Sequence, residues 1–418
     1  MNGVSHEQLP EAVLIVVPVY RGEQTTRDCL QSLVDSELPA NVSVLIIDDA
    51  SPEPAVKAIC REFAAGEGFQ LVENETNRGF VASVNSGFQA DPAADVILLN
   101  SDTRVANDWV ARLQRCAYQQ AEIGTVTPFT NNGTICSYPV FMGSSPLPQG
   151  WSVSELDALF SRCNSGQYAT IPTAVGFCMY IKRACLREVG EFDVENFGHG
   201  YGEECDFSLR AAQRGWLNVI AADTFVFHEG GASFAAETQD RKRRADQVIN
   251  ELHPQYHAQV LQFTQSDPLR RYRRSIDAAR VAKDPAQVGA IFAEHESQLQ
   301  QVLEHSDALL QNLLEEQGQR QEEQRQRDEL ERLLEQSRQQ FALTDRALTE
   351  AQACVDEKNL SIERLNGEIA DLHAAIEERD EMLRAAYLQR DVVNERIAAM
   401  EQSRSWRYTA LLRRHQED

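Results

Sequence analysis

The sequence of 418 residues predicts an α/β domain built on a doubly wound, mostly parallel sheet, followed by a long α-helical coiled coil. Three observations support this fold class. Apolar runs alternate with segments of helical spacing in the first part of the chain. Two of these runs stop abruptly at carboxylates, at Asp48 and at Asp102. In the last third, apolar residues recur every seven positions.

The alternation begins with residues 12–17, a continuous apolar run rich in β-branched residues that is typical of a strand buried on both faces. A helix is expected between each strand and the next, and strands connected in this way lie parallel with right-handed crossovers. The expected strands are 12–17, 42–47, 69–72 and 96–99, and the expected helices are 25–33, 54–63 and 79–88.

The composition excludes one class of partner and indicates a compartment. A formal charge of −24 argues against nucleic acid, because a polyanion is repelled by the average field of the chain. The nine cysteines never occur in Cys-x-x-Cys spacing, which favours free thiols in a reducing compartment. The first residues lack the basic start and long apolar run of a signal peptide, and the run ending at Val17 is shorter than the ~20 residues of a membrane span. We therefore expect a cytoplasmic chain.

Three acidic clusters stand at expected strand ends or at an expected helix start, at residues 48–49, at Asp102 and at residues 203–206. In open α/β sheets, ligands bind at the carboxyl ends of the strands. Carboxylates gathered there suggest one crevice for a metal ion and phosphates. The alternative is that the first two clusters are polar turns after buried strands, and that the third only favours a helix N-terminus.

Five short motifs, in this order, resemble those of the inverting nucleotide-sugar transferases of glycosyltransferase family 2, which have the glycosyltransferase-A fold. The resemblance covers about residues 13–233 and points to the type that builds bacterial surface polysaccharides, including rhamnosyltransferases. The motifs are Val17-Pro18-Val19-Tyr20, Ile47-Asp48-Asp49-Ala50-Ser51, Asn77-Arg78-Gly79-Phe80 with Asn85, Leu99-Asn100-Ser101-Asp102, and Gly202-Glu203-Glu204-Cys205-Asp206 with Arg210.

This resemblance implies a site for a nucleotide-sugar donor. Asp49 takes the position of the aspartate that hydrogen-bonds the nucleotide base. Pro18 and Tyr20 line the same base pocket, and Asn77 and Gly79 border the nucleotide.

The resemblance also implies a site for Mg²⁺ or Mn²⁺ where the family has its Asp-x-Asp motif. Asn100 replaces the first aspartate here, so Asp102 carries most of the compensation of the metal's charge, and Asn100 is expected to contact substrate. His228 corresponds to a histidine that reaches the metal or the diphosphate. The alternative for His228 is a core or surface histidine without a ligand.

The general base that removes the acceptor's proton falls on Glu204 by the same resemblance. Asp206 is the alternative if the register of the motif is shifted, and Glu203 is expected to contact substrate. Gly176 lies in a strand with a glycine kink and is expected under the acceptor sugar.

We expect four segments. These are a glycosyltransferase domain at 1–265, a basic linker at 266–286, a coiled coil at 287–400 and a basic, aromatic tail at 401–418. The coiled coil is predicted from apolar residues spaced seven apart, and it should make the chain a homo-oligomer. The heptad positions are Leu334, Phe341, Leu348, Val355, Ile362, Ile369, Ile376 and Leu383, with Ile397 after Arg390.

Two basic runs, 241–244 and 270–274, interrupt an otherwise acidic chain. Such runs are usually solvated helix faces. The alternative is that they contact phosphates of a lipid-linked acceptor or an anionic membrane surface.

The sequence as a whole predicts a metal-dependent inverting glycosyltransferase with a nucleotide-sugar donor, and the expected donor sugar is rhamnose. The expected acceptor is a growing cell-surface polysaccharide or a lipid-linked oligosaccharide. Peripheral contact with the inner membrane or with polysaccharide-assembly proteins remains open. Two rivals are a catalytically silent scaffold that acts through its coiled coil and a nucleotide-sugar-binding module that regulates another enzyme.

Overall fold

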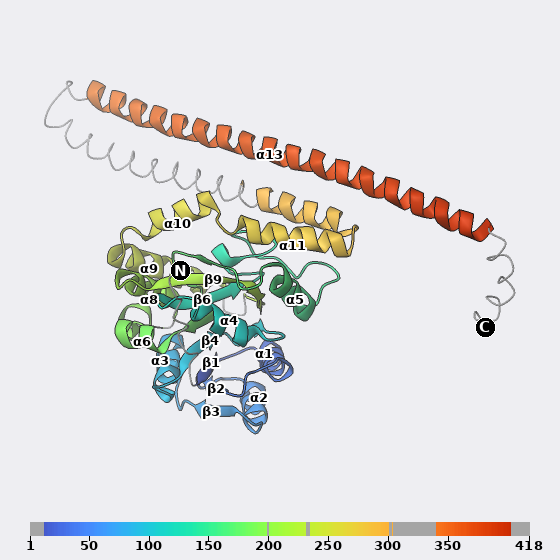
Figure 1. Cartoon of the computed structure of the whole chain (residues 1–418). Coiled ribbons are helices and arrows are strands. Elements are labelled where there is room, and N and C mark those ends of the chain that lie inside the picture. The colour runs from blue at the N-terminus through green and yellow to red at the C-terminus, as the bar shows by residue number, and fades with distance from the viewer. Residues whose placement is uncertain (1–11, 199, 231–234, 301–302, 304–339, 403–418) are drawn as a thin grey trace, which may run out of the picture. The chain divides into compact units, whose positions relative to one another are not determined.

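The computed structural model describes residues 12–198, 200–230, 235–300, 303 and 340–402 (Figure 1). The chain divides into two compact units with the boundary between Gln311 and Asn312. The first unit holds a β-sheet and the helices around it. The described part of the second unit is one helix, α13, which runs from Gln340 to Gln402.

Within the described residues of the first unit, eight strands form one sheet in the order β3-β2-β1-β4-β8-β6-β9-β7. Neighbours β3, β2, β1 and β4 are parallel, as are β6 and β9. In contrast, β8 is antiparallel to both β4 and β6, and β7 is antiparallel to β9. The strands are β1 (Val13–Val19), β2 (Val42–Asp48), β3 (Phe69–Glu73), β4 (Asp95–Leu99), β6 (Ile123–Phe129), β7 (Tyr168–Thr170), β8 (Cys178–Ile181) and β9 (Leu217–Phe225).

The sheet is therefore mixed, which corrects the expectation of a mostly parallel sheet for its second half. Hydrophobic periodicity predicts where a strand lies, but not the direction in which it enters a sheet. The first half follows the predicted alternation, because α1 (Glu23–Asp35), α2 (Pro54–Ala64) and α3 (Phe80–Ala90) separate its strands.

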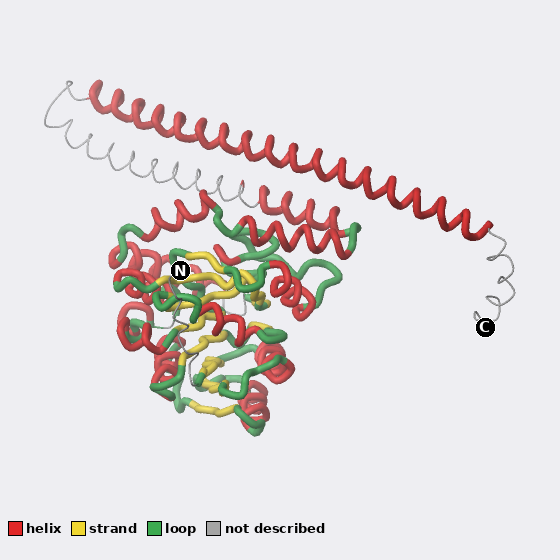
Figure 2. Tube along the Cα trace, viewed as in Figure 1, coloured by secondary structure: helices red, strands yellow, loops and turns green. Residues whose placement is uncertain are grey.

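β1 shows why these residues form a central strand. Ile15 and Val17 belong to one hydrophobic core, and Leu14 and Val16 belong to a second core on the opposite face. Helices flank the strands, as Figure 2 shows in red and yellow. One helix comes very close: a methyl group at Gly87 of α3 would stand 2.5 Å from Val16, so only glycine allows this approach.

The second half of the unit adds a short two-stranded sheet of β5 (Thr103–Arg104) and β10 (Phe227–His228), which pair antiparallel. Several of its helices pack against β6 and β9. Its first helices are α4 (Trp109–Ala117), the 3-10 turn η1 (Thr134–Cys136), α5 (Val153–Cys163), α6 (Arg183–Val189), α7 (Val194–Phe197) and α8 (Glu203–Gln213).

Further helices follow in the described part of the unit: α9 (Ala235–Leu252), α10 (Tyr256–Ser266), α11 (Arg270–Lys283) and the helix of residues 287–300. Residues 266–286, expected as a basic linker, are folded into the domain. Leu269, Tyr272 and Ile276 are fully or almost fully buried in a core shared with α5 and β9. The apolar residues among the basic ones give α11 one buried face. Charge composition alone does not distinguish such a helix from a basic linker.

α13 covers the second half of the expected coiled coil. Several of its large apolar side chains are exposed in the single chain, including Val355, Val393, Ile397 and Met400. Residues 304–339, which include the weak segment 315–329, lie outside the described residues, as does the tail 403–418. Among the described residues, no helix has the length and apolar character needed to cross a membrane.

Candidate active site

The first half of the sheet brings several predicted residues to one edge. β1, β2 and β4 run parallel, so their carboxyl ends meet there, and this is where open α/β sheets bind ligands. Asp49 follows β2 and Asn100 follows β4. Pro18 is buried near the end of β1, where it pairs with Ile47 of β2. Tyr20, just beyond the strand, is 38% exposed.

Asp49 organises the loop that leads into α3. Its Oδ1 accepts hydrogen bonds from the Asn74 side chain and from the Arg78 backbone N–H, both at 2.8 Å. Its Oδ2 accepts one from the Gly79 N–H at 2.9 Å. The Asn77 side chain accepts a second bond from the same N–H at 3.0 Å. Asp49, Asn77 and Gly79, predicted to lie around one nucleotide, are thus joined in one network.

The β5–β10 ribbon brings Asp102 and His228 together from distant parts of the chain. His228 pairs with Thr103 across the ribbon, and its Nε2 lies 3.4 Å from Oδ1 of Asp102. Both side chains are largely buried, with 17% and 19% of their surface exposed. The loop after β6 also holds His228, because Asn131 exchanges two hydrogen bonds with its backbone.

The hydrogen bonds of His228 define which ring nitrogen faces Asp102. Nδ1 lies 2.7 Å from the backbone carbonyl of Asn132, which can only accept, so Nδ1 carries a proton. In the neutral ring, Nε2 therefore presents a lone pair toward the Asp102 carboxylate. Burial alone would lower the pKa of His228, but the hydrogen bond and charge of Asp102 and the Asn132 carbonyl outweigh burial and raise it. The pair attracts positive charge, either as a proton or as a metal ion.

Asn100 stands next to this pair. Its backbone N–H donates to the Phe177 carbonyl at 2.9 Å, and its own carbonyl accepts the Thr103 hydroxyl at 2.7 Å. Its side-chain Oδ1 is buried and has no hydrogen-bond partner among the residues that the structure describes. An orphaned buried carbonyl oxygen is costly, and a ligand or cation that accepts its lone pair would remove that cost.

Glu203 and Glu204 form the acidic side of the site, at the first turn of α8. Each has a buried Oε2 without a hydrogen-bond partner in the described part of the chain. Burial raises the pKa of both carboxyl groups, and the charge of Glu204 raises the pKa of Glu203 further. Gly176 lies directly against Glu204, since a methyl group at Gly176 would be 3.4 Å from the Cγ of that side chain.

Asp206 is held differently. Its Oδ2 lies 2.7 Å from Nε of Arg210 and its Oδ1 lies 2.9 Å from Nε2 of His253. Arg210 also donates to the carbonyls of Val189 and Glu191, so Asp206 ties α8 to the α6–α7 connection and to the turn after α9. Both oxygens of Asp206 are engaged, whereas Oε2 of Glu203 and Oε2 of Glu204 have no partner among the described residues.

Phe177 connects the two sides of the site and was not among the predicted residues. Its ring stacks on His228 with a centroid distance of 5.3 Å and an interplanar angle of 18°. Its carbonyl holds Asn100, and its neighbour Gly176 contacts Glu204. The adjacent Gly176 was the only local signal for this position, because Phe177 itself resembles any buried aromatic residue. Asn131 and Asn132 were also missed, because their hydrogen bonds with His228 join distant segments of the chain.

The donors present fit a divalent cation that takes part of its coordination from a substrate. Among the described residues, no cluster of three or more His, Cys, Asp or Glu side chains could hold a metal alone. Asp102, His228 and the Asn100 carbonyl offer two oxygens and one nitrogen, which suits Mn²⁺ or Mg²⁺ completed by phosphate oxygens.

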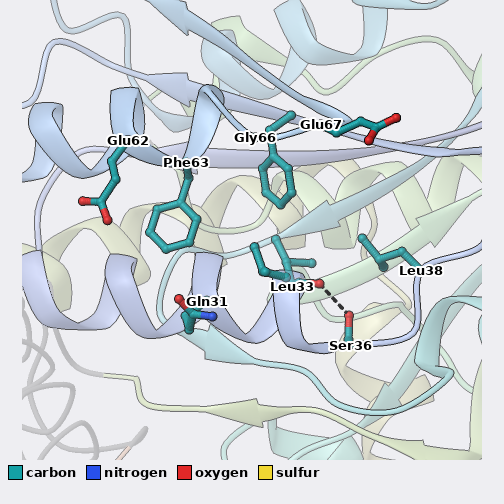
Figure 3. A pocket seen from close by; sticks show the side chains of 10 residues that line it. Gln31, Leu33, Ser36, Leu38, Glu62, Phe63, Gly66 and Glu67 are labelled. Carbon is teal, nitrogen blue, oxygen red and sulfur yellow. Dashed lines mark hydrogen bonds between the residues drawn. The ribbon is translucent and has the colours of Figure 1, made fainter.

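A pocket of about 480 Å³ lies elsewhere, between α1 and α2 (Figure 3). Apolar Leu33, Leu38 and Phe63 line it together with Glu62 and Glu67. None of the predicted site residues contributes to it, so this pocket is separate from the candidate active site.

Comparisons with known proteins agree with these motifs. Residues 14–190 match the family model described as glycosyl transferase family 2. Poly-beta-1,6-N-acetyl-D-glucosamine synthase of Staphylococcus epidermidis is 25% identical over 191 residues, which are 46% of this chain and 44% of that protein. Glycosyltransferase GlyA of Streptococcus pneumoniae is 27% identical over 123 residues, 29% of this chain and 17% of its own length. The chain thus spans less than half of these relatives.

Among solved structures, mannosyltransferase PcManGT from Pyrobaculum calidifontis, in complex with GDP-Man and Mn²⁺, aligns with a TM-score of 0.44 and 16% identity. The alignment covers 70% of this chain and 84% of that one. The matched family segment holds Asp49, Asn77, Asn100 and Asp102 at the edge where β1, β2 and β4 end. Residues 14–190 are therefore a glycosyl transferase family 2 domain.

Proposed function

We propose that the chain is a metal-dependent, inverting glycosyltransferase that moves a sugar from a nucleoside-diphosphate donor to an acceptor hydroxyl. One observation carries this proposal. Phe177 and Gly176 join a cation-attracting pair, Asp102 and His228, to a carboxylate with an unpartnered oxygen, Glu204. Displacement of a diphosphate by a hydroxyl needs positive charge at the leaving group and a base at the nucleophile.

The donor's nucleotide is assigned to the Asp49 network. Oδ2 of Asp49 accepts one hydrogen bond among the described residues, from Gly79, which leaves it a lone pair for an N–H of the base. Pro18 and the exposed ring of Tyr20 stand beside it at the end of β1. The Asn77 side chain accepts a hydrogen bond from the Gly79 N–H in the same loop. Asn77 is therefore assigned to the border of the nucleotide site.

The donor's diphosphate is assigned to the side that carries Asp102 and His228. These two residues, with the Asn100 side-chain oxygen, would hold Mn²⁺ or Mg²⁺. The cation supplies charge compensation for the leaving nucleoside diphosphate. His228 keeps its orientation through Nδ1 and Asn132, so Nε2 stays turned toward Asp102.

Glu204 is the proposed general base. Its unpartnered oxygen is free to accept a proton, and a pKa raised by burial makes its ionised form a stronger base than an exposed glutamate. Asp206, the alternative, has both oxygens engaged by Arg210 and His253, which suits it to positioning α8. Glu203 and Gly176 would then contact the acceptor sugar beside Glu204.

The acceptor in this proposal is a growing cell-surface polysaccharide or a lipid-linked oligosaccharide, and rhamnose is the first donor sugar to test. The choice of acceptor rests on the resemblance of the motifs. The choice of rhamnose rests on the Asn100-Ser101-Asp102 variant alone. The proposed assembly is a homo-oligomer joined through the heptad positions of α13 and of the residues before it.

A matched pair of variants tests the function. We expect Glu204→Gln to lower turnover by ~10²-fold or more with donor affinity within a few-fold, because the amide keeps the shape but accepts no proton. The assay follows release of nucleoside diphosphate across a panel of nucleotide sugars with Mn²⁺. Asp206→Asn is the control for the register of the motif. An active Glu204→Gln beside a crippled Asp206→Asn would move the base to Asp206, and no turnover with any donor would favour a silent scaffold.

A further inference from the structure

The basic run Arg241-Lys242-Arg243-Arg244 lies on α9, and all four side chains are exposed. α9 is in contact with α7 and with α8, the helix that begins with Glu203 and Glu204 (Figure 1). A concentration of positive charge therefore lies on the helix that packs against α8, in a chain whose formal charge is −24.

Lys242 is a member of the run and contacts the rest of the domain. It precedes Ala245 by three positions and the buried Ile249 by seven, so it shares their side of the helix. Its Nζ lies 5.3 Å from the centre of the Tyr201 ring. Arg243 is six positions before Ile249 and one after Lys242, which places it on a different side of α9.

Tyr201 stands immediately before α8. Its φ of 74° is in the left-handed region, where a bulky residue is strained. A methyl group at the next residue, Gly202, would be 2.9 Å from the Phe197 ring and 3.4 Å from the Cβ of Ala245. The loop is therefore packed between α7 and α9, and this packing holds the Tyr201 ring under Lys242 and within three residues of Glu204.

This arrangement would serve an acceptor that carries negative charge. Such an acceptor is repelled by the net charge of the chain and by Glu203 and Glu204, so a cation must offset that repulsion at the place where it binds. A neutral acceptor would need no such group. Lys242 supplies a point charge with three N–H donors, a common partner of phosphate, and the Tyr201 ring offers a flat surface for a sugar.

We propose that Lys242 and Tyr201 form a subsite that binds a phosphate ester of the acceptor. The inference deepens the proposed function and rests on it, because it names the acceptor class for the same site. The phosphate has two candidate sources with one chemistry: a phosphate on the saccharide itself, or the phosphate of a lipid that carries the saccharide.

Two binding experiments on the full chain test the subsite. Both use the Asp102→Ala background with EDTA, so that the proposed metal-dependent donor site takes up no phosphate. The first titrates glucose 1-phosphate, with glucose as the neutral comparison, by calorimetry. The second measures sedimentation with phosphatidylcholine vesicles that either contain or lack phosphatidic acid. Each probe is tested against Lys242→Ala, Lys242→Glu and Tyr201→Ser, with Arg243→Glu as the control of equal charge change.

We expect the phosphate-bearing probe to bind better than its neutral counterpart, and Lys242→Glu to weaken that binding about tenfold or more, because it reverses the charge at contact distance. Lys242→Ala and Tyr201→Ser should weaken it less, and Arg243→Glu should leave it nearly unchanged. Binding of glucose 1-phosphate that depends on Lys242 supports a phosphorylated saccharide. Dependence on Lys242 with phosphatidic acid vesicles alone supports a lipid phosphate.

The inference is overturned if neither probe depends on Lys242, if neither phosphate-bearing probe binds better than its neutral counterpart, or if Arg243→Glu has the same effect as Lys242→Glu. Failure of the proposed function would be seen in a different measurement, as absent donor turnover by the unsubstituted chain. The two failures are therefore distinguishable.

Discussion

At the scale of single residues, the candidate site holds carboxyl groups in surroundings that oppose their ionisation. Burial raises the pKa of Glu203, and the charge of Glu204 raises it further. The unfolded chain ionises the same group near its ordinary value. As pH rises above that value, the unfolded chain releases the proton first, so stability falls until the pH passes the raised folded-state pKa. The site is therefore a place where the fold gives up stability for chemistry.

Replacing the carboxyl group of Glu203 should recover part of that stability. We expect Glu203→Gln to raise Tm at pH 8, by about 2–4 °C for each ~1 kcal/mol regained. The gain should shrink toward pH 4, where the folded wild-type carboxyl is protonated. Differential scanning calorimetry between pH 4 and pH 8 measures the gain in Tm and its dependence on pH. Glu195→Gln, an exposed change on α7, is the control, and a gain that does not vary with pH would contradict the assigned cause.

Phe177 gives a second prediction at this scale. We expect Phe177→Leu to weaken Mn²⁺-dependent binding of nucleoside diphosphate by about tenfold, because it removes the ring that stacks on His228. Titration calorimetry measures the affinity, and thermal unfolding measures the loss of stability. Phe160→Leu is the matched control, since Phe160 is equally buried but packs on Phe129, Tyr138 and Phe225. Equal losses of affinity in both variants would reduce Phe177 to an ordinary core residue.

At the scale of elements, a buried ion pair fastens α11 to the helix of residues 287–300. Arg280 is fully buried and contacts Glu294 at 2.6 Å and the Tyr138 hydroxyl at 2.9 Å. Burial alone would lower the pKa of Arg280, but the hydrogen bond with Glu294 and the neighbouring Tyr138 raise it above its ordinary value. Tyr138 also donates to Asp277, so one polar network spans the loop after β6, α11 and the next helix.

We expect Arg280→Met to destabilise the first unit by about 3–5 kcal/mol, because it leaves Glu294 partly buried without its partner. Urea unfolding followed by tryptophan fluorescence measures the effect, and Trp151 is a local reporter, since its indole N–H lies 3.4 Å from Gln287 of the same helix. The double variant Arg280→Met with Glu294→Leu should recover part of the loss. A double variant as unstable as the single one would mean that packing, and not charge, holds this helix.

Elements were predictable from the sequence where their pattern is local. β1 to β4 and α1 to α3 follow from apolar runs and helical spacing alone, and the motifs at their ends placed Asp49, Asn100 and Asp102 at one edge. The reversed direction of β8 and the docking of α11 depend on contacts between distant segments, which no window of the sequence contains. Phe177 was missed for the same reason: its partners, Asn100 and His228, come from other elements.

At the scale of the whole molecule, the compact first unit extends beyond the predicted boundary, to Gln311. A truncation that tests the role of the C-terminal helix must therefore keep Glu294. We expect a chain ending at Gln311 to be monomeric and to keep donor binding, and the full chain to be oligomeric, because the large apolar side chains exposed on α13 each gain roughly 1.5–3 kcal/mol when covered. Light scattering after size-exclusion chromatography measures both, and an oligomeric truncation would contradict this assignment.

The ribbon of β5 and β10 also sets an order of events during synthesis. β5 is synthesised early, but Asp102 can pair with His228 only after most of the domain has been synthesised. β4 likewise pairs with β8, which is synthesised much later. Pairings between strands so far apart in the sequence form slowly. A nascent chain that stops before His228 should therefore hold the nucleotide-side loop around Asp49 and yet fail to retain Mn²⁺. With the proposed metal site, retention of Mn²⁺ would then report that translation has passed β10.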